Sequence, residues 1–369
     1  MTDNKAIAPG DVLREELKRR DWTQDMLARI MGRPASAVNE IITGKRSISA
    51  EIARELESAL RVSAKTWLKL EMEFQLEQVA SPIAIEERAR PFYHAPVKEM
   101  EKRGWIKRTN TPSETEAELC RYFGVNALTD NPRIKVAART YAKEGSLNEG
   151  QIAWCYRALN LAPSAPATTY TAAKLKGALP ELRAMASQPE LARRVPRILA
   201  DTGVRLVIVE HLHGSQISGA ALWLDDKRPV IALSLLGDKM DRFWFTLQHE
   251  ISHILHKDGE RLDVDLGEAG FDAWSIDTDV ERRANADAAA ALIEPSRLDD
   301  FIRRKKHVMS QTTIIQFANL IQIHPGIVVG QLQHRGVLGW DFHTKLLPRI
   351  REHLVGEALT DGYGHRPTV

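Results

Sequence analysis

A motif of the form H-E-x-x-H at residues 249–253 constrains this 369-residue chain more than any other feature. Apolar side chains recur from residue 243 to residue 255 at spacings typical of a buried helix. In a helix, His249 and His253 lie on one face about 6 Å apart, so both can bind one Zn²⁺ ion. Glu250 lies beside them, where it can take a proton from a water on the metal. The motif therefore predicts metal-assisted peptide hydrolysis.

Three stretches that precede the motif are rich in β-branched and other apolar residues. They are residues 204–209, 219–224 and 230–235. Runs of this length and composition are typical of buried strands. The sequence thus predicts a small β-sheet that leads into the helix with the motif.

A zinc site with two histidines needs a third protein ligand. Nine acidic residues lie between positions 257 and 281, so the presence of an acidic residue does not by itself identify the third ligand. Residues 279–293 are rich in alanine, begin with acidic side chains and end before Pro295, which predicts a helix. Glu281 lies on this rigid element and is our candidate for the third ligand. The expected ion is Zn²⁺, with Mn²⁺ as an alternative for the same donors.

At this point the sequence resembles a known family, the ImmA/IrrE metallopeptidases, which pair an H-E-x-x-H helix with a Glu-x-x-x-Asn helix. The second element is matched by Glu281-Arg-Arg-Ala-Asn285. The resemblance implies a zincin-like α+β domain with Glu250 as the catalytic residue. One departure is Asp287, where the family usually has an aromatic residue. His256 and His324 are candidates for stabilising an oxyanion, although an ordinary surface or loop contact is the simpler interpretation of both.

The amino-terminal residues have a different pattern, that of a compact five-helix module. The expected helices are Gly10–Lys18, Thr23–Met31, Pro34–Ile42, Ala50–Leu60 and Ala64–Glu77. The second and third are separated by Gly32, and the third ends at Gly44. This arrangement predicts a helix-turn-helix.

In a helix-turn-helix, the second helix enters the major groove of double-stranded DNA by its amino-terminal end. Side chains at that end are therefore expected near base edges, and those at the helix ends near phosphates. The candidates for base edges are Arg33, Ser36, Ala37 and Asn39, and those for phosphates are Thr23, Gln24, Lys45 and Arg46. Asn39 is suited to a bidentate contact with adenine.

Charge supports this interpretation locally, because residues 14–46 carry eight basic and five acidic side chains. Together with the segments Gly44-Lys-Arg-Ser-Ile-Ser49 and Thr66-Trp-Leu-Lys-Leu70, the module resembles HigA-type antitoxins among the Xre-like regulators. The resemblance implies a cytoplasmic regulator that represses its own operon. A helical protein-interaction domain with a charged face is the alternative.

The expected fold is mainly α with a small β-sheet. We divide it into a helix-turn-helix domain at residues 1–80, a helical connector at 81–200, a metallopeptidase domain at 201–335 and a carboxy-terminal tail at 336–369 that is partly ordered. Trp105 and Trp154 of the connector are expected in its core, as are the chain's two cysteines, Cys120 and Cys155. Their number and spacing suit neither a disulfide framework nor a zinc knuckle.

Composition places the chain among soluble globular proteins, with 43% hydrophobic and 27% charged residues. No apolar run reaches the length of about 18 residues that a membrane helix needs, and the amino terminus lacks the apolar core of a signal peptide. We therefore expect a cytoplasmic protein that does not bind a membrane.

The leading hypothesis is a DNA-binding regulator or antitoxin with an embedded zinc endopeptidase that cleaves a partner repressor or itself. Its partners are operator DNA, a toxin or repressor protein, and a second copy, because two half-sites call for a homodimer. The rival hypothesis is a non-enzymatic antitoxin-repressor whose degenerate peptidase domain binds a toxin or senses a ligand.

Overall fold

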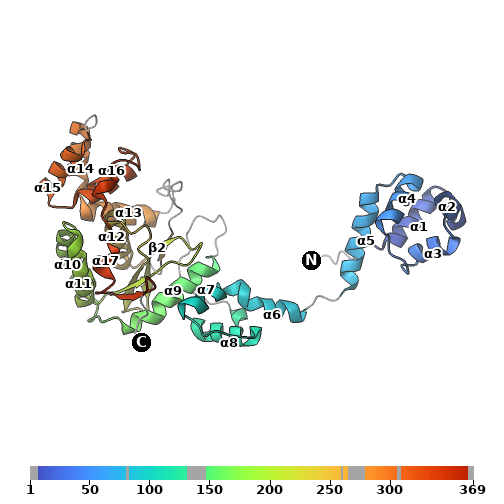
Figure 1. The fold of residues 1–369 in the computed structure, drawn as a ribbon, viewed down its shortest axis with the longest axis horizontal. Helices are drawn as coiled ribbons and strands as arrows, with labels where there is room; N and C mark the ends of the chain where they lie inside the picture. Colours follow the sequence, from blue (N-terminus) through green and yellow to red (C-terminus); the bar gives the residue numbers. More distant parts are fainter. Residues whose placement is uncertain are drawn as a thin grey trace. The chain divides into compact units, whose positions relative to one another are not determined.

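The computed structural model describes residues 7–79, 83–130, 147–258, 261–264, 279–305 and 309–364. The chain forms two compact units, Met1–Glu86 and Glu87–Val369. Each has its own hydrophobic core, and each is described here by itself (Figure 1).

The first unit consists of five helices. They are α1 (Pro9–Arg19), α2 (Gln24–Met31), α3 (Ala35–Ile42), α4 (Ala50–Leu60) and α5 (Ala64–Gln78). Hydroxyl side chains of Thr23, Ser49 and Ser63 cap α2, α4 and α5 by accepting hydrogen bonds from backbone amides of the first turn. All five predicted helices are therefore present, with ends that shift by at most one residue.

The apolar face of every helix in this unit contributes to its core. Leu13, Leu27, Val38, Leu56 and Trp67 are each 0% exposed. Between α2 and α3 the chain reverses at Gly32, whose φ of 65° lies in the left-handed region that glycine adopts without strain. The turn places α2 and α3 in contact.

A five-stranded mixed sheet lies at the centre of the second unit. Its strands are β1 (Arg205–Val209), β2 (Ile217–Trp223), β3 (Pro229–Leu233), β4 (Arg261–Val264) and β5 (Leu359–Asp361). The order is β4-β2-β3-β1-β5. β1 pairs in parallel with β3 and β5, whereas β2 pairs antiparallel with β3 and β4. The three predicted strands correspond to β1, β2 and β3.

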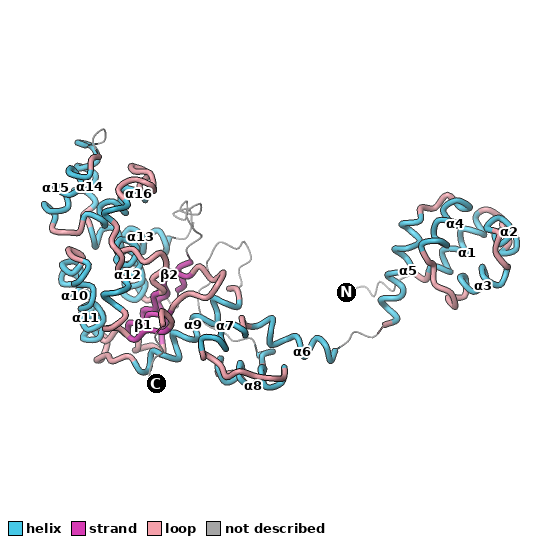
Figure 2. Tube along the Cα trace, in the orientation of Figure 1, coloured by secondary structure: helices cyan, strands magenta, loops and turns pink. Residues whose placement is uncertain are grey.

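Both faces of the sheet are buried, which explains why β3 and most of β1 are continuously apolar. Leu206 and Ile208 of β1 face one core, and Val207 and Val209 face the other, because successive strand residues point to opposite faces. On the second face lies α9 (Glu149–Leu161). On the first lies α12 (Met240–His256), which carries the motif (Figure 2).

The remaining helices complete the two layers. They are α6 (Ile83–His94), α7 (Val97–Arg103), α8 (Pro112–Phe123), α10 (Ala172–Met185), α11 (Val195–Thr202), α13 (Asp279–Leu292), α14 (Pro295–Lys305), α15 (Gln311–Ile321), α16 (Pro325–His334) and α17 (Arg351–Leu354). Among the described residues, no single helix is long and apolar enough to cross a membrane, and α15 with α16 meets that test only as a pair bent by 111°.

Residues 87–200 differ from the predicted separate connector, because they belong to the same unit as the sheet. Trp154 of α9 is 0% exposed and donates its indole N–H to the carbonyl of Val209, 2.9 Å away. Arg103 of α7 donates to the carbonyls of Glu210 and His211 at 2.7 Å each. The expectation that Trp105 and Trp154 lie in a core is confirmed, and that core is one face of the sheet.

Part of the tail from residue 336 belongs to the sheet of the second unit. Its β5 extends the sheet beside β1, and Asp361 at the end of β5 forms an ion pair with Arg157 of α9. The carboxylate of Asp361 is 3% exposed. Residues 359–361 are thus an integral part of the second unit.

Candidate metal centre and candidate nucleic-acid interface

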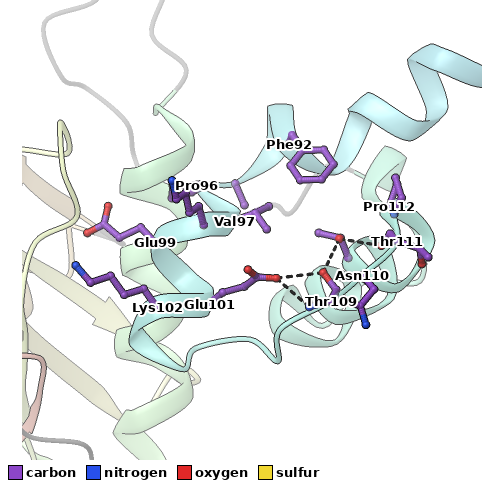
Figure 3. A pocket seen from close by; sticks show the side chains of 13 residues that line it. Phe92, Pro96, Val97, Glu99, Glu101, Lys102, Thr109, Asn110, Thr111 and Pro112 are labelled. Atoms are coloured by element: carbon purple, nitrogen blue, oxygen red, sulfur yellow. Dashed lines mark hydrogen bonds between the residues drawn. The ribbon is translucent and has the colours of Figure 1, made fainter.

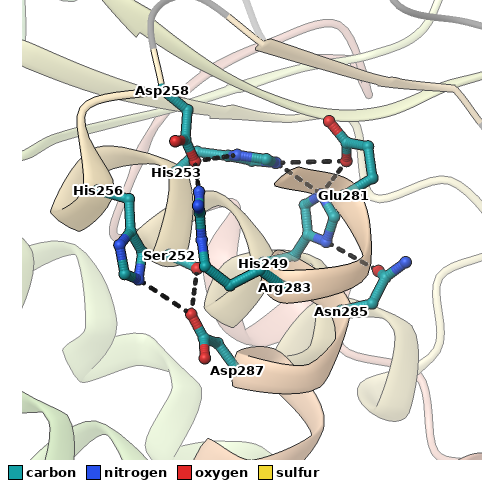
Figure 4. A network of polar contacts seen from close by, with 9 residues as sticks. All are labelled: His249, Ser252, His253, His256, Asp258, Glu281, Arg283, Asn285 and Asp287. Carbon is teal, nitrogen blue, oxygen red and sulfur yellow. Dashed lines mark hydrogen bonds and ion pairs between the residues drawn. The ribbon is translucent and has the colours of Figure 1, made fainter. Parts of the chain in front are cut away.

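The predicted ligands come together between α12 and α13. The Nε2 atoms of His249 and His253 lie 2.9 Å apart, and the Oε2 atom of Glu281 lies 3.3 Å from the first and 3.5 Å from the second. Figure 4 shows the carboxylate of Glu281 directed toward both imidazoles. Ligands about 2.0–2.1 Å from a tetrahedral zinc ion are about 3.3 Å from one another, so the three atoms fit a shared ion.

The outer nitrogens of both imidazoles are held by hydrogen bonds. His249 donates from Nδ1 to the side-chain oxygen of Asn285, and His253 donates from Nδ1 to Asp258, each over 3.0 Å. In a neutral imidazole this arrangement leaves the lone pair on Nε2. Two such lone pairs and one carboxylate then converge, and a cation between them satisfies all three.

Asp258 reaches His253 because the chain reverses at the end of α12. Lys257 adopts a left-handed conformation with φ of 54°, and the amide of Asp258 bonds back to the carbonyl of His253. Arg283 of α13 donates to the same carboxylate. Burial opposes ionisation of Asp258, but the hydrogen bonds from Arg283 and His253 hold the pKa of its carboxyl below the usual value.

Glu281 is held in its ionised form by the same histidines. Burial raises the pKa of this carboxyl, whereas the hydrogen bonds that His249 and His253 donate from Nε2 when no cation is bound and their imidazoles are protonated outweigh burial and place the pKa well below its usual value. Only 15% of the Glu281 side chain is exposed. The site thus presents an anionic oxygen to any cation that enters.

Glu250 lies on the side of α12 that faces β2. Its side chain is 0% exposed. Gly219 of β2 leaves room for it, since a Cβ atom at position 219 would lie 2.9 Å from Oε1 of Glu250 and 2.7 Å from the methyl carbon of Thr246. A glycine at this strand position therefore allows the carboxylate to lie against the sheet, directly after the candidate ligand His249 in sequence.

Asp287, the departure from the family pattern, forms a polar link between the two helices. Its carboxylate accepts a hydrogen bond from the hydroxyl of Ser252 over 2.6 Å and lies 3.2 Å from Nε2 of His256 (Figure 4). The imidazole of His256 is 45% exposed and is outside the group of three ligands. These contacts match the simpler interpretation of His256, a local surface contact.

His324 also has a local role. It caps α16, where its Nδ1 accepts a hydrogen bond from the amide of Gly326 over 3.0 Å. Burial lowers the pKa of His324. The two cysteines behave as expected for packing residues, with Cys155 buried and Cys120 half-buried.

Sequence analysis did not identify Asp258 or Arg283 as parts of the site. Asp258 was one of nine acidic residues in its segment, and Asn285 appeared only as a member of a motif. One usable signal was the general tendency of zinc-binding histidines to donate their second N–H to a carboxylate or amide oxygen. An acidic residue five positions after His253 can accept this hydrogen bond when the helix ends between the two residues.

A separate open pocket of about 660 Å³ lies among α6, α7 and α8 (Figure 3). Its acidic side chains already have structural partners. Glu101 accepts hydrogen bonds from the amide and hydroxyl of Thr109, and Glu99 pairs with Arg103. The pocket therefore offers no cluster of free catalytic groups within the described residues.

The candidate DNA-contacting residues divide by exposure. Ser36 and Asn39 of α3 are exposed, as are Lys45 and Arg46 after it. Arg46 also pairs with Glu40 over 2.8 Å. Near α2, Thr23 is exposed and caps the helix, and Gln24, which begins it, is half-buried. These side chains form the exposed surface around the turn at Gly32.

Two candidates are engaged within the unit. Ala37 is 6% exposed and packs in the core, so its side chain does not lie at the surface. Arg33 donates to both carboxylate oxygens of Glu55, at 2.5 Å and 2.9 Å. This hydrogen-bonded pairing lowers the pKa of Glu55 and raises that of Arg33. In this structure Arg33 connects the turn to α4, and a contact with DNA would require it to leave Glu55.

Comparisons with known proteins concern the amino-terminal unit. A helix-turn-helix family model matches residues 13–67. Virulence-associated protein I of Dichelobacter nodosus is 34% identical over 73 residues, which cover 20% of this chain and 68% of that protein.

Two similar solved structures cover the same region. The first is a putative antidote protein of a plasmid maintenance system from Nostoc punctiforme, with 32% identity, coverage of 20% of this chain and 81% of that one, and a TM-score of 0.20. The second is the Pseudomonas aeruginosa antitoxin HigA with the higBA promoter, with 36% identity, coverage of 20% and 80%, and a TM-score of 0.19.

Proposed function

Because this chain belongs to the helix-turn-helix family through residues 13–67, we propose that it is a DNA-binding transcriptional regulator of the antitoxin type that carries a zinc-dependent endopeptidase in its second unit. The DNA would be an operator, and the protein partner a toxin or a repressor. The observation that carries the peptidase is the convergence of His249, His253 and Glu281, with Glu250 directly after His249 in the chain.

The DNA-binding part is supported by the exposed end of α3. Ser36 and Asn39 lie on its outer side, and Lys45 follows it, so one short segment offers contacts for bases and for phosphate. We expect Asn39→Ala to weaken binding to a specific operator by about 1–3 kcal/mol while nonspecific binding persists. Lys45→Ala should weaken both and reduce the salt dependence by about one unit of slope. Equal loss by both variants on specific and random DNA, measured by fluorescence anisotropy, would argue against base recognition by α3.

In the proposed peptidase, each residue of the site has its own role. His249, His253 and Glu281 would hold the ion, and the bound ion would polarise the peptide carbonyl as a Lewis acid. Glu250 accepts the proton of the attacking water and delivers it to the departing amide nitrogen. Asn285 and Asp258 fix the imidazoles in the tautomer that presents Nε2 to the ion.

One observation favours the rival function, a metal site that serves binding or sensing. Glu250 and His253 are 0% and 1% exposed, so the described residues leave the base little access to a peptide. A repressor of this kind would bind its partner stoichiometrically. The two functions therefore differ in whether one protein molecule cleaves many partner molecules or binds its partner without cleaving it.

Metal content is the first test of the site. Purified full-length protein should contain about one equivalent of Zn²⁺ by elemental analysis, and His253→Ala should contain little. His256→Ala is the matched control, because His256 lies one turn further along α12 and pairs with Asp287. Equal zinc in all three proteins would refute this ligand set.

Turnover is the second test. Wild-type protein and Glu250→Gln are incubated with a bacterial lysate, and new peptide amino termini are identified by terminal labelling and mass spectrometry. The variant should retain zinc and lose the cleavages, because Gln cannot accept the proton. Cleavage sites common to both would contradict the mechanism, and zinc retained without any cleavage would favour the rival function. Termini within the protein itself would reveal self-cleavage.

A further inference from the structure

An open groove of about 420 Å³ lies between α14 and α15 of the second unit, and none of the metal-site candidates lines it. Its floor is apolar. The rings of Phe301 and Phe317 stack there with their centroids 4.1 Å apart, and Leu320, which lines the same groove, is 71% exposed. We call this site the α14–α15 groove, after the two helices labelled in Figure 1. Its cationic side chains all belong to α14 and are those of Arg297, Arg304 and Lys305.

The lining side chains come from one face of each helix. Residues 297, 301 and 304–305 of α14 follow one another at intervals of three or four, and so do residues 313, 316–317 and 320 of α15. Side chains at this spacing share one side of a helix. The groove is therefore bounded by two regular faces, one with cations and the other with an exposed leucine.

Positive charge in the groove exceeds negative charge. Asp300, the acidic residue of its lining, already pairs with Arg304 over 2.7 Å and with Arg303 over 2.5 Å. Arg297 and Lys305 have no carboxylate partner in the part of the chain that the structure describes. Two cations at the groove are therefore available to pair with a ligand.

The stability of α14 does not explain the position of Arg297. Cations in the last turn of a helix are favoured by the helix dipole, which accounts for Arg304 and Lys305 without any ligand. Arg297 lies in the first turn, where a cation is unfavourable and where α14 has no acidic residue. Its exposed guanidinium is therefore better suited to an external anion than to the stability of its own helix.

We propose that the α14–α15 groove is a docking site for an acidic segment of the protein partner. One large apolar side chain of that segment covers Leu320, and carboxylates on either side of it pair with Arg297 and Lys305. An apolar anchor with charges at its rim combines affinity with selectivity. The inference rests on the proposed function in that the partner is the toxin or repressor on which the second unit acts.

Nucleic acid would satisfy the same cations but not the floor of the groove. Base stacking needs an accessible aromatic face. Phe301 and Phe317 instead stack on each other and are each 8% exposed. Contacts with phosphates alone would leave Leu320 in water, whereas an apolar side chain removes its surface from water and gains affinity by doing so. The observations thus favour an acidic peptide segment.

Fluorescence anisotropy on the full-length protein tests the site with a labelled peptide in which single leucines are flanked by glutamates. We expect saturable binding that Arg297→Glu and Leu320→Ser each weaken at least about fivefold, the first by repulsion and the second by loss of apolar contact. Two altered peptides separate these contributions. One has glutamine in place of glutamate, the other has serine in place of leucine, and each should bind at least about fivefold more weakly.

Arg303→Glu is the matched control. Arg303 lies on the same helix and the substitution changes the charge by the same amount, but its side chain is 78% exposed and does not line the groove. Peptide binding should change less than about threefold in this variant. Circular dichroism verifies that each variant is folded.

Three results would overturn the proposal. The first is no binding of the leucine-glutamate peptide to the wild type at millimolar concentration, and the second is equal binding by the wild type and all three variants. The third is weaker binding of duplex DNA by Arg297→Glu with peptide binding unchanged, which would make the groove a contact for phosphate.

The outcomes also separate this inference from the proposed function. His253→Ala should bind the peptide as the wild type does, because His253 does not line the groove. Peptide binding that responds to the groove variants, in a protein with neither zinc nor cleavage, would keep the docking site and remove the peptidase. Zinc-dependent cleavage at equal rates by the wild type and Leu320→Ser, with no peptide binding by either, would have the opposite meaning.

Discussion

Asp258 contacts a metal-ligand candidate without being one itself, so its effect on the site is separable from that of the ligands. Removal of its carboxylate by Asp258→Ala frees Nδ1 of His253 and leaves Arg283 without its partner. Loss of such an orienting group typically lowers metal affinity about 10- to 100-fold. We expect that loss for Zn²⁺, measured by competition with a chelating dye, while the fold is retained.

Asp287→Ala is the matched control, because Asp287 also bonds to a histidine of α12. That histidine is His256, outside the ligand group, so zinc affinity should change less than threefold, within about 0.7 kcal/mol. Similar losses in the two variants would mean that general disturbance of the contact between α12 and α13 lowers affinity. In that event the orienting role of Asp258 would be rejected.

Asp241, in the first turn of α12, should make stability depend on pH. It is 9% exposed, and burial raises the pKa of its carboxyl, although Lys239 and Arg242 partly offset that effect. Since the folded pKa exceeds that of the unfolded chain, the folded state binds the extra proton between the two values, and stability increases as pH falls through this range. Asp241→Asn should therefore gain stability over the wild type at pH 8 and lose that advantage near pH 4.

Urea unfolding of the two proteins at pH 8, 6 and 4 measures this difference. The Asn variant keeps the size of the side chain and carries no charge at any of these values. A stability difference that is independent of pH would mean that Asp241 has a similar pKa in the folded and unfolded states.

The proximity of the candidate ligands could be predicted from sequence because it follows largely from helix geometry. His249 and His253 are one turn apart in any helix. Glu281 was chosen as the third candidate ligand because it lies on an alanine-rich helix. The contact of Asp258 with His253 depends on the left-handed backbone conformation of Lys257, which the presence of a lysine does not predict. Arg33 was placed correctly at the turn, but its pairing with Glu55 joins residues 22 positions apart, which no local pattern encodes.

At the scale of elements, the packing of α16 on α12 depends on a glycine. A Cβ atom at Gly330 would lie 2.7 Å from Oδ2 and 2.8 Å from Cβ of Asp241. Gly330→Ala should therefore destabilise the second unit by about 1–3 kcal/mol through overpacking, despite the better helix propensity of alanine. Denaturant unfolding followed by tryptophan fluorescence measures the change.

Gly177→Ala in α10 is the matched substitution, because a Cβ atom there meets nothing within 4 Å. It should stabilise by about 0.5–1 kcal/mol, the usual advantage of alanine over glycine within a helix. Stabilisation by both substitutions would show that α16 can move away from α12 at little cost.

Elements with a strong local pattern were predicted well, and those that depend on distant partners were not. Residues 206–209 and 230–233 are apolar throughout because helices cover both faces of the sheet, and this signal is visible in sequence. β5 has three residues, and it is a strand because β1 and Arg157 are beside it. In the same way, α9 has the pattern of any buried helix, which does not reveal that its partner is a sheet formed later in the chain.

At the scale of the whole molecule, two compact units predict two separate responses to ligands. The core around Leu56 and Trp67 lies within the first unit, whereas the metal-site candidates lie in the second. A ligand that binds a folded unit stabilises that unit, by about 2.7 kcal/mol when its concentration is a hundred times the dissociation constant. For a unit of this size the midpoint of unfolding should shift by roughly 5 °C or more.

Differential scanning calorimetry of the full chain can follow both units at once. Zn²⁺ should raise one transition and operator DNA the other, and His253→Ala should abolish only the shift caused by zinc. If both ligands raised a single common transition, the two units would unfold as one. Binding of metal at the second unit could then be coupled to binding of DNA at the first through shared stability, because a ligand that stabilises one state of a cooperative molecule affects every site in it. Separate transitions would require a regulatory link between the units, if there is one, to act through cleavage or a partner.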